Sequence, residues 1–309
     1  MFRRIGNAWR IMVKSVKFMF KKPLCLIPFV IALVLNVTFL VVIQLNVNLD
    51  TLSNGETLGL VFFIIFVETF FVSIASLILL ELLEQYETDG DMRFGKAIGD
   101  ALTKDLFRAL PIILGWSIIQ FLIMILEAIF SGDSNGRGKS FISRAISRFF
   151  RVIKKGVRMG AMLIMAAIAW EDISPGKAYQ KGKSVYKSNF VEIASSIAIS
   201  SLFSLLLILP LILVVIIISV ANLQVGVWFI YFLMFYFAFM WSAGLLIEQL
   251  FAAELYLWFR VYEKEKEEAE HSGSTVPLSI HSVKKPSFFD EVPDFITNDY
   301  GKKDTQMDY

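Results

Sequence analysis

The sequence predicts an all-α polytopic membrane protein with six transmembrane helices and amphipathic interfacial helices. The 309 residues are 56% hydrophobic with a mean hydropathy of +0.63, which is above the usual composition of soluble domains. The 30 Lys and Arg residues fall in five blocks, at 1–22, 93–108, 137–158, 177–187 and 260–303. The stretches between these blocks carry no basic residue, which is typical of helices that cross a bilayer.

Apolar runs predict the positions of the spans. Five strong runs lie at about 24–47, 58–83, 109–130, 191–220 and 226–259. Each can cross a hydrocarbon layer of about 30 Å as a helix, which satisfies its own backbone hydrogen bonds in lipid. The first run is far longer than a signal-peptide core and no small-residue cleavage site follows it, so we expect a retained anchor. A weaker sixth span is expected around 157–173, where only Met159–Trp170 follows the last cation.

Three basic segments ahead of the spans begin alike. They are GNAWRIMVKSVKFMFKK from Gly6, GKAIGDALTKDLFRAL from Gly95 and GKAYQKGKSVYKSNF from Gly176. We interpret them as helices in the headgroup region, with apolar faces toward the bilayer and cations toward anionic lipid. The alternative, that short basic amphipathic helices simply look alike, stays open.

These segments lead to a prediction of domains and sidedness. We expect a transmembrane domain over 1–263, with a threefold repeat of 1–83, 92–173 and 174–263, followed by a disordered cytoplasmic tail over 264–309. An internal N-terminus and six spans place 22 of the 30 basic residues inside, which fits the excess of Lys and Arg in cytoplasmic loops. Both termini are therefore expected to be cytoplasmic. The exception is 131–158, whose eight basic residues would face outward.

That exception supplies the candidate site. Unpaired cations inside a bilayer cost several kcal/mol each, so those that enter the fourth span need partners. By depth, we expect Glu68 to pair with Arg158, and Glu127 to pair with one of the cations closer to the outer surface. The predicted intramembrane polar cluster comprises Glu68, Glu127, Arg151, Lys154, Lys155 and Arg158. Two interpretations stay open: a polar cavity that holds an anionic group such as a lipid phosphate, or structural pairing with long side chains reaching the headgroups.

Other candidate motifs fail on spacing. GDSNGRGKS at 132–140 resembles a phosphate-binding loop, but the first glycine of that pattern falls on Asp133 and no strand precedes it. Both histidines lie in the tail, which excludes a His-based metal or hydrolase site within the membrane. Glu248 and Glu254 are about 120° apart around their helix, so we do not expect them to share a metal or proton site on it. We predict no catalysis, no cofactor, no metal and no nucleic-acid binding.

Two segments resemble known proteins. ALPIILGWSIIQFL and the final AAELYLWFRVYEKEKE resemble a family of uncharacterised six-span prokaryotic integral membrane proteins, and are similar to the membrane domain attached to some glycerophosphodiester phosphodiesterases. In those groups the last span runs into a Leu-Tyr pair, an Arg and acidic residues, which here are Leu255, Tyr256, Arg260 and Glu263. The resemblance covers about 1–265, implies a six-helix module in a prokaryotic plasma membrane and carries over no active-site residue.

Two functions follow as hypotheses. The sequence favours a non-enzymatic accessory or scaffold protein that contacts anionic lipid headgroups, and a protein partner through its tail, where SFFDEVPDF mixes aromatic and acidic residues. The alternative is a small transporter or lipid-handling protein that uses the polar cluster. A transporter requires a water-filled cavity beside Glu68 and Arg158, whereas a scaffold keeps these side chains packed or paired.

Overall fold

A computed structural model describes residues 2–48, 51–131, 141–220, 226–272, 277 and 280–283. Within these residues the chain is all-helical, so the predicted fold class is confirmed. The α-helices are α1 (Phe2–Lys21), α2 (Ile27–Asn46), α3 (Asn54–Asp89), α4 (Phe94–Asp100), α5 (Leu106–Ser131), α6 (Phe141–Glu171), α7 (Pro175–Ser188), α8 (Phe190–Val220) and α9 (Val227–Ser272). Three short turns complete the described elements: the 3-10 turns η1 (Pro23–Leu26) and η4 (Ile280–Ser282), and the π-helical turn η3 (Ala101–Asp105).

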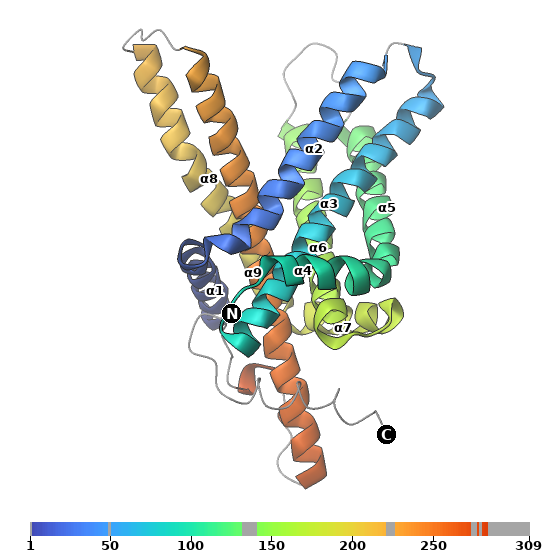
Figure 1. Cartoon of the computed structure of the whole chain (residues 1–309), viewed down its shortest axis with the longest axis vertical. Coiled ribbons are helices and arrows are strands. Elements are labelled where there is room, and N and C mark those ends of the chain that lie inside the picture. Colours follow the sequence, from blue (N-terminus) through green and yellow to red (C-terminus); the bar gives the residue numbers. More distant parts are fainter. Residues whose placement is uncertain are drawn as a thin grey trace.

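The helices follow one another as a lead helix and two long helices, three times along the chain. The units are α1–α2–α3, α4–α5–α6 and α7–α8–α9. Figure 1 shows the lead helices α1, α4 and α7 at a similar level, while in each unit the first long helix ends and the second begins at the opposite end. We call the level of the lead helices the basal end and the opposite end the apical end. This order is the one that a threefold repeat requires, while common descent of the units stays a prediction.

Contacts between helices permute cyclically among the three units. Each lead helix packs on the last helix of another unit: α4 on α3, α7 on α6, and α1 on α9. The last helices also contact one another, and each packs on the first long helix of the next unit, as α3 does on α5, α6 on α8 and α9 on α2. Helices α3, α6 and α9 are therefore the inner helices, and α2, α5 and α8 are the outer ones.

The core lies toward the basal end, between the inner helices. Leu77 of α3, Met162 of α6 and Phe251 of α9 are fully buried there. Helix α7 packs so closely on α6 that a Cβ at Gly182 would lie 2.6 Å from the Ile164 side chain. A side chain at this position would separate the two helices, so glycine permits the contact.

Four helical stretches are long and apolar enough to cross a membrane: Pro23–Asn46, Asn54–Asp89, Phe94–Phe130 and Tyr231–Ser272. These stretches are compatible with an integral membrane protein. Helix α6 is not among them because its first half carries several cations. Helix α8 is a continuous apolar helix of 31 residues, of which Phe190–Ser201 and Ile208–Ile218 are apolar stretches within the described residues. Four spans are thus supported by length and composition, and six spans stay a prediction.

The charged segment EKEKEEAE at the start of the tail is expected to continue the last helix briefly, and the structure contains such an extension. Helix α9 continues to Ser272, and its charged extension carries the pairs Lys264–Glu268 and Lys266–Glu270, whose i,i+4 spacing supports a helix. Beyond it, the side chain of Val283 is buried and its carbonyl accepts a hydrogen bond from Trp258 Nε1 at 3.4 Å. Residues 284–309, with the SFFDEVPDF segment, lie outside the described residues, as does 132–140.

Candidate functional site

Helix α6 carries the predicted cations, and α5 supplies the first partner. Lys154 Nζ lies 2.5 Å from Glu127 Oε2, and both side chains are about one-third exposed or less. The sequence predicted that Glu127 would pair with one of three cations, and the structure places Lys154 against it. Arg151, one turn earlier, is exposed and makes no ion pair within the described part of the chain.

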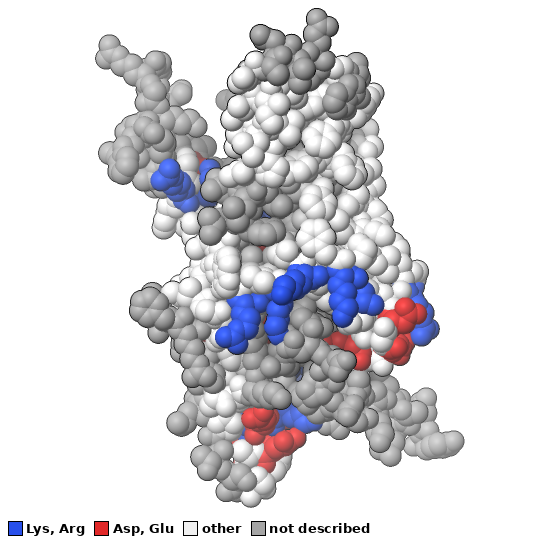
Figure 2. All heavy atoms as spheres, turned by 90° about the vertical axis from the view of Figure 1, so that its left-hand side faces the viewer, with Lys and Arg blue, Asp and Glu red and all other residues white. Residues whose placement is uncertain are grey.

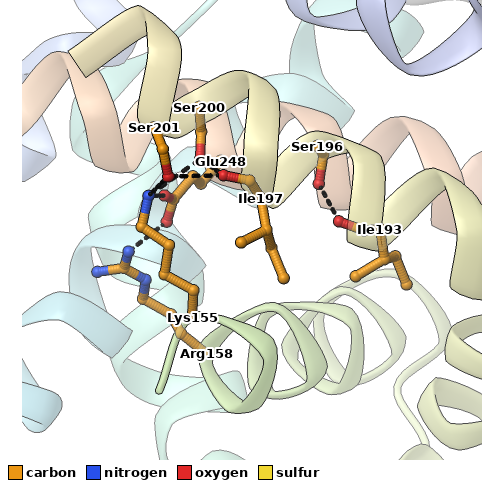
Figure 3. Close-up of polar contacts among 8 residues, drawn as sticks. All are labelled: Lys155, Arg158, Ile193, Ser196, Ile197, Ser200, Ser201 and Glu248. Carbon is orange, nitrogen blue, oxygen red and sulfur yellow. Dashed lines mark hydrogen bonds and ion pairs between the residues drawn. The ribbon is translucent and has the colours of Figure 1, made fainter. Parts of the chain in front are cut away.

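Helix α9 supplies the second partner, Glu248. Arg158 Nη2 lies 2.6 Å from Glu248 Oε2, and Lys155 Nζ lies 3.8 Å from Glu248 Oε1. Lys155 also donates hydrogen bonds to the hydroxyls of Ser200 and Ser201 on α8, both at 3.1 Å. Figure 3 shows Lys155 and Arg158 reaching the same carboxylate from α6. The cluster therefore joins α6, α8 and α9, and Glu248 is its most buried ionised member, with 11% of its side chain exposed.

The expected ion pair between Glu68 and Arg158 is not among those of the described residues. Glu68, on α3, interacts with Arg158 only through the longer-range electrostatic field. The sequence suggested Glu68 as the partner of Arg158 because the two residues lie at similar depths along their helices. Which side chains meet is decided by the rotation of each helix about its own axis. Glu248 was not predicted as a partner, because its position was compared only with that of Glu254 on the same helix. Its position inside an apolar run was the available signal, since intramembrane acids generally require a partner.

A second polar cluster lies at the basal end of α6, α7 and α9. Tyr256 donates its hydroxyl to Glu171 Oε1 at 2.5 Å, and Lys181 Nζ lies 2.6 Å from Glu171 Oε2 and 2.9 Å from Glu263 Oε2. Arg260 Nε lies 3.9 Å from the same Glu171 carboxylate. Of the α9 residues that carry the family resemblance, Tyr256 and Arg260 thus contact Glu171 of α6, and Glu263 contacts Lys181 beside it.

Charge in this basal cluster affects Lys181. Partial burial lowers the pKa of Lys181, but hydrogen bonds to Glu171 and Glu263 and their negative charges outweigh burial, so the pKa lies above its ordinary value. Lys181 is therefore charged at neutral pH and acts as a bridge between α6 and α9. The cluster has the character of a structural joint, because its acids are already occupied by protein partners.

A groove of about 600 Å³ lies beside the ion pairs of α6, walled by α5, α6, α7 and α8. Its lining is mainly aliphatic and aromatic, and includes Trp116, Ile119, Tyr179, Tyr186 and Phe190. Gly115, Gly156 and Gly160 hollow the walls where a larger side chain would fill them. Neither Glu68 nor Arg158 lines this groove. It therefore suits an apolar occupant, and it is not the polar cavity that a transporter hypothesis requires.

Comparison with family models, curated proteins and solved structures finds no match to this chain. The resemblance carried by Leu255, Tyr256, Arg260 and Glu263 thus stays a prediction. Among the described residues, no group of three or more His, Cys, Asp or Glu side chains is arranged to hold a metal ion. The functional argument therefore rests on the ion pairs, the groove and the surfaces of the lead helices.

Proposed function

We propose that this chain is a non-enzymatic, six-span accessory or scaffold protein that contacts anionic phospholipid, with both termini on the cytoplasmic side of a prokaryotic plasma membrane. The basal end would then face the cytoplasm. We also propose that the C-terminal tail binds a protein partner. Helix α1 carries the main support, because its surface divides into three faces with different chemistry.

One face of α1 is buried and the second is apolar but exposed. Ala8, Ile11 and Phe18 pack against the bundle. About 155° around the helix from these residues, Trp9 is 51% exposed and Phe20 is 70% exposed. Exposed aromatic residues are costly in water but are favourable at a membrane interface, where Trp is enriched. This apolar face is what lipid contact requires.

The third face of α1 is basic. It is formed by Arg10, Lys14, Lys17 and Lys21, and Figure 2 shows basic side chains in a band across this side of the molecule. The stripe lies about 110° beyond the exposed apolar face. An interfacial helix in this orientation directs its cations toward headgroups, and each cation near an anionic surface contributes about 1 kcal/mol. The arrangement favours anionic over zwitterionic lipid.

The ion pairs support the inclusion of α6 among six spans. Lys154 with Glu127, and Arg158 with Glu248, remove most of the cost of bringing cations into the hydrocarbon layer. Helix α6 has 31 residues, about 46 Å at ~1.5 Å per residue, so it exceeds the hydrocarbon layer of about 30 Å. Arg151, which is exposed, lies in the part that can extend toward the apical headgroups.

The same pairs favour a scaffold over a transporter. Lys154 and Arg158, which a transporter would use to hold an anion, are already paired with Glu127 and Glu248, and the neighbouring groove is apolar. A lipid-handling role is the second candidate, and the groove is the observation that favours it. Neither role requires a reacting group.

Spin-labelled lipids test this proposal. The chain is placed in phosphatidylcholine vesicles that contain a trace of one spin-labelled lipid. At the same protein content, the motionally restricted fraction should be several-fold larger for spin-labelled phosphatidylglycerol than for spin-labelled phosphatidylcholine. Changing Arg10, Lys14, Lys17 and Lys21 together to Gln should remove most of that selectivity, and so should high salt. The matched control changes Lys264 and Lys266 of the charged α9 extension to Gln. Selectivity that survives neutralisation of α1 would refute the proposal.

A further inference from the structure

We propose that the groove between α5, α6, α7 and α8 binds one acyl chain of an anionic phospholipid from the basal leaflet, with the headgroup beside Arg108 and Lys183. This inference rests on the proposed function and deepens it by naming a lipid class and a defined site. Four observations carry it: the length of the groove, its width, its opening and the cations at its rim.

The groove has the length of one leaflet. On α6 it extends from Val152 to Ile164, which is about 18 Å of helix at ~1.5 Å per residue. One leaflet contributes about half of a hydrocarbon layer of roughly 30 Å. Near the apical end of the groove, Lys155 hydrogen-bonds to Ser200 and Ser201 and so ties α6 to α8. An extended acyl chain of the basal leaflet therefore matches the groove in length.

The groove is wide enough for one extended hydrocarbon chain. Its volume of about 600 Å³ is spread over about 18 Å of α6. An extended acyl chain is slender, so a single chain can lie along the groove.

The groove opens toward lipid along its side. Ile119 on the α5 wall is 45% exposed, and Phe190 at the start of α8 is 58% exposed. Both belong to the outer helices, whose apolar surfaces face the surrounding bilayer in the proposed orientation. A chain can therefore enter laterally from the leaflet without crossing a polar barrier.

The basal rim carries cations on the same helix faces as the lining. On α5, Arg108 precedes the lining residues Ile112 and Gly115 by four and seven positions, so all three share a face. On α7, Lys183 stands four positions after Tyr179, and its Nζ lies 6.0 Å from the centre of that ring.

The two cations differ in whether an acidic side chain of the protein already pairs with them. Arg108 pairs with Asp172, whereas Lys183 is exposed and makes no ion pair in the described part of the chain. A phosphate that enters with its acyl chain in the groove would therefore meet an unpaired ammonium at Lys183. This charge favours an anionic phospholipid over a zwitterionic one.

Trp116 provides a direct reporter, because it lines the groove. The full chain is placed in phosphatidylcholine vesicles that contain either phosphatidylglycerol or phosphatidylcholine with brominated acyl chains. The contribution of Trp116 is the tryptophan fluorescence of the unmodified chain minus that of the Trp116→Phe variant. We expect brominated phosphatidylglycerol to quench this contribution at least twofold more than brominated phosphatidylcholine.

Three variants test the site itself. Gly115→Leu should fill the groove and reduce quenching of Trp116 by both lipids, because a Cβ at Gly115 meets open space and the longer side chain can extend. Gly59→Leu on α3, where the Cβ position is equally open, is the matched control and should leave quenching unchanged. Lys183→Gln should abolish the preference for phosphatidylglycerol while quenching by phosphatidylcholine remains. Thermal unfolding of each variant establishes that the fold is retained.

Several results would overturn the inference. Equal quenching by the two lipids in the unmodified chain would mean contact with bulk lipid, and a Trp116 protected from both would mean that protein fills the groove. Unchanged quenching in folded Gly115→Leu would also refute it. Neutralising the α1 stripe tests a different surface. If the α1 variant loses its lipid selectivity but Gly115→Leu leaves Trp116 quenching unchanged, only the groove proposal is refuted. If the α1 variant keeps its selectivity but Gly115→Leu reduces Trp116 quenching, the proposed function is refuted and the groove proposal stands.

Discussion

Arg158 on α6 and Glu248 on α9 form an ion pair with 2.6 Å between Nη2 and Oε2, and it joins two of the three inner helices. Lys155 lies on the same carboxylate at 3.8 Å. The carboxylate therefore contacts two cations in a region where most neighbouring side chains are apolar. Its removal should have a larger effect than the loss of an ion pair in water.

Glu248→Gln should destabilise the bundle by about 2–4 kcal/mol, because it leaves two partly buried cations without a counter-charge. We place the expected effect near the lower end, since 26% of the Arg158 side chain is exposed. Thermal unfolding in detergent micelles, calibrated with denaturant, measures the change. Glu265→Gln on the charged extension is the control.

Adding Arg158→Gln to Glu248→Gln should recover part of the lost stability, because the remaining Lys155 then has less positive charge beside it. If the double variant is as unstable as the sum of the two single variants, the pair is not coupled. This result would contradict the role of Glu248 as the shared acid.

Gly182→Ala should destabilise the contact between α6 and α7 by about 1–3 kcal/mol through overpacking. The new Cβ would lie 2.6 Å from the Ile164 side chain and 3.1 Å from its backbone nitrogen, so side-chain rotation alone cannot relieve the clash. Gly176→Ala, at the open start of α7, is the control and should be neutral or slightly stabilising. Equal unfolding temperatures for the two variants would contradict the close approach.

Stability should fall at alkaline pH through Lys181. Its pKa is raised above the ordinary 10.5 in the folded chain, so the folded state holds this proton more tightly than the unfolded state. The resulting stabilisation is fully present below about pH 10.5 and is lost as pH rises through the higher folded value.

Unfolding temperatures measured between about pH 8 and 12 test this sign. Lys181→Met should lose less stability over the alkaline range than the unmodified chain, whereas Lys183→Met, which removes a lysine with no ion pair in the described residues, should follow the unmodified chain. Parallel curves for the unmodified chain and Lys181→Met would refute the assignment.

Residues 134 and 184 should lie on opposite sides of the membrane. Cys25 is buried, so Ser134→Cys and Ser184→Cys can be labelled selectively in intact cells. We expect a membrane-impermeant maleimide to label position 134 from outside and to label position 184 only after permeabilisation. Labelling of both from one side would eliminate α6 as a span and would reverse the sidedness of the C-terminal region.

The local sequence pattern was sufficient to predict the all-helical class and the positions of the lead helices. Apolar runs free of cations indicate where a helix can lie in lipid, because length and hydropathy are properties of consecutive residues. The same reasoning set the depth of the α6 cations and predicted a partner for Glu127. At the tail it predicted the charged extension of α9, whereas the burial of Val283 against distant residues could not be predicted from local pattern.

The sequence by itself determined which residues share a helix and which charges need a partner. Only the tertiary structure decided that Arg158 meets Glu248 in place of Glu68, that Tyr256 and Lys181 converge on Glu171, and that α5 to α8 enclose a groove. The reason is geometric. A helix sets the spacing of its own side chains, whereas a contact between helices depends on their relative rotation and depth, which the packing of the whole bundle establishes.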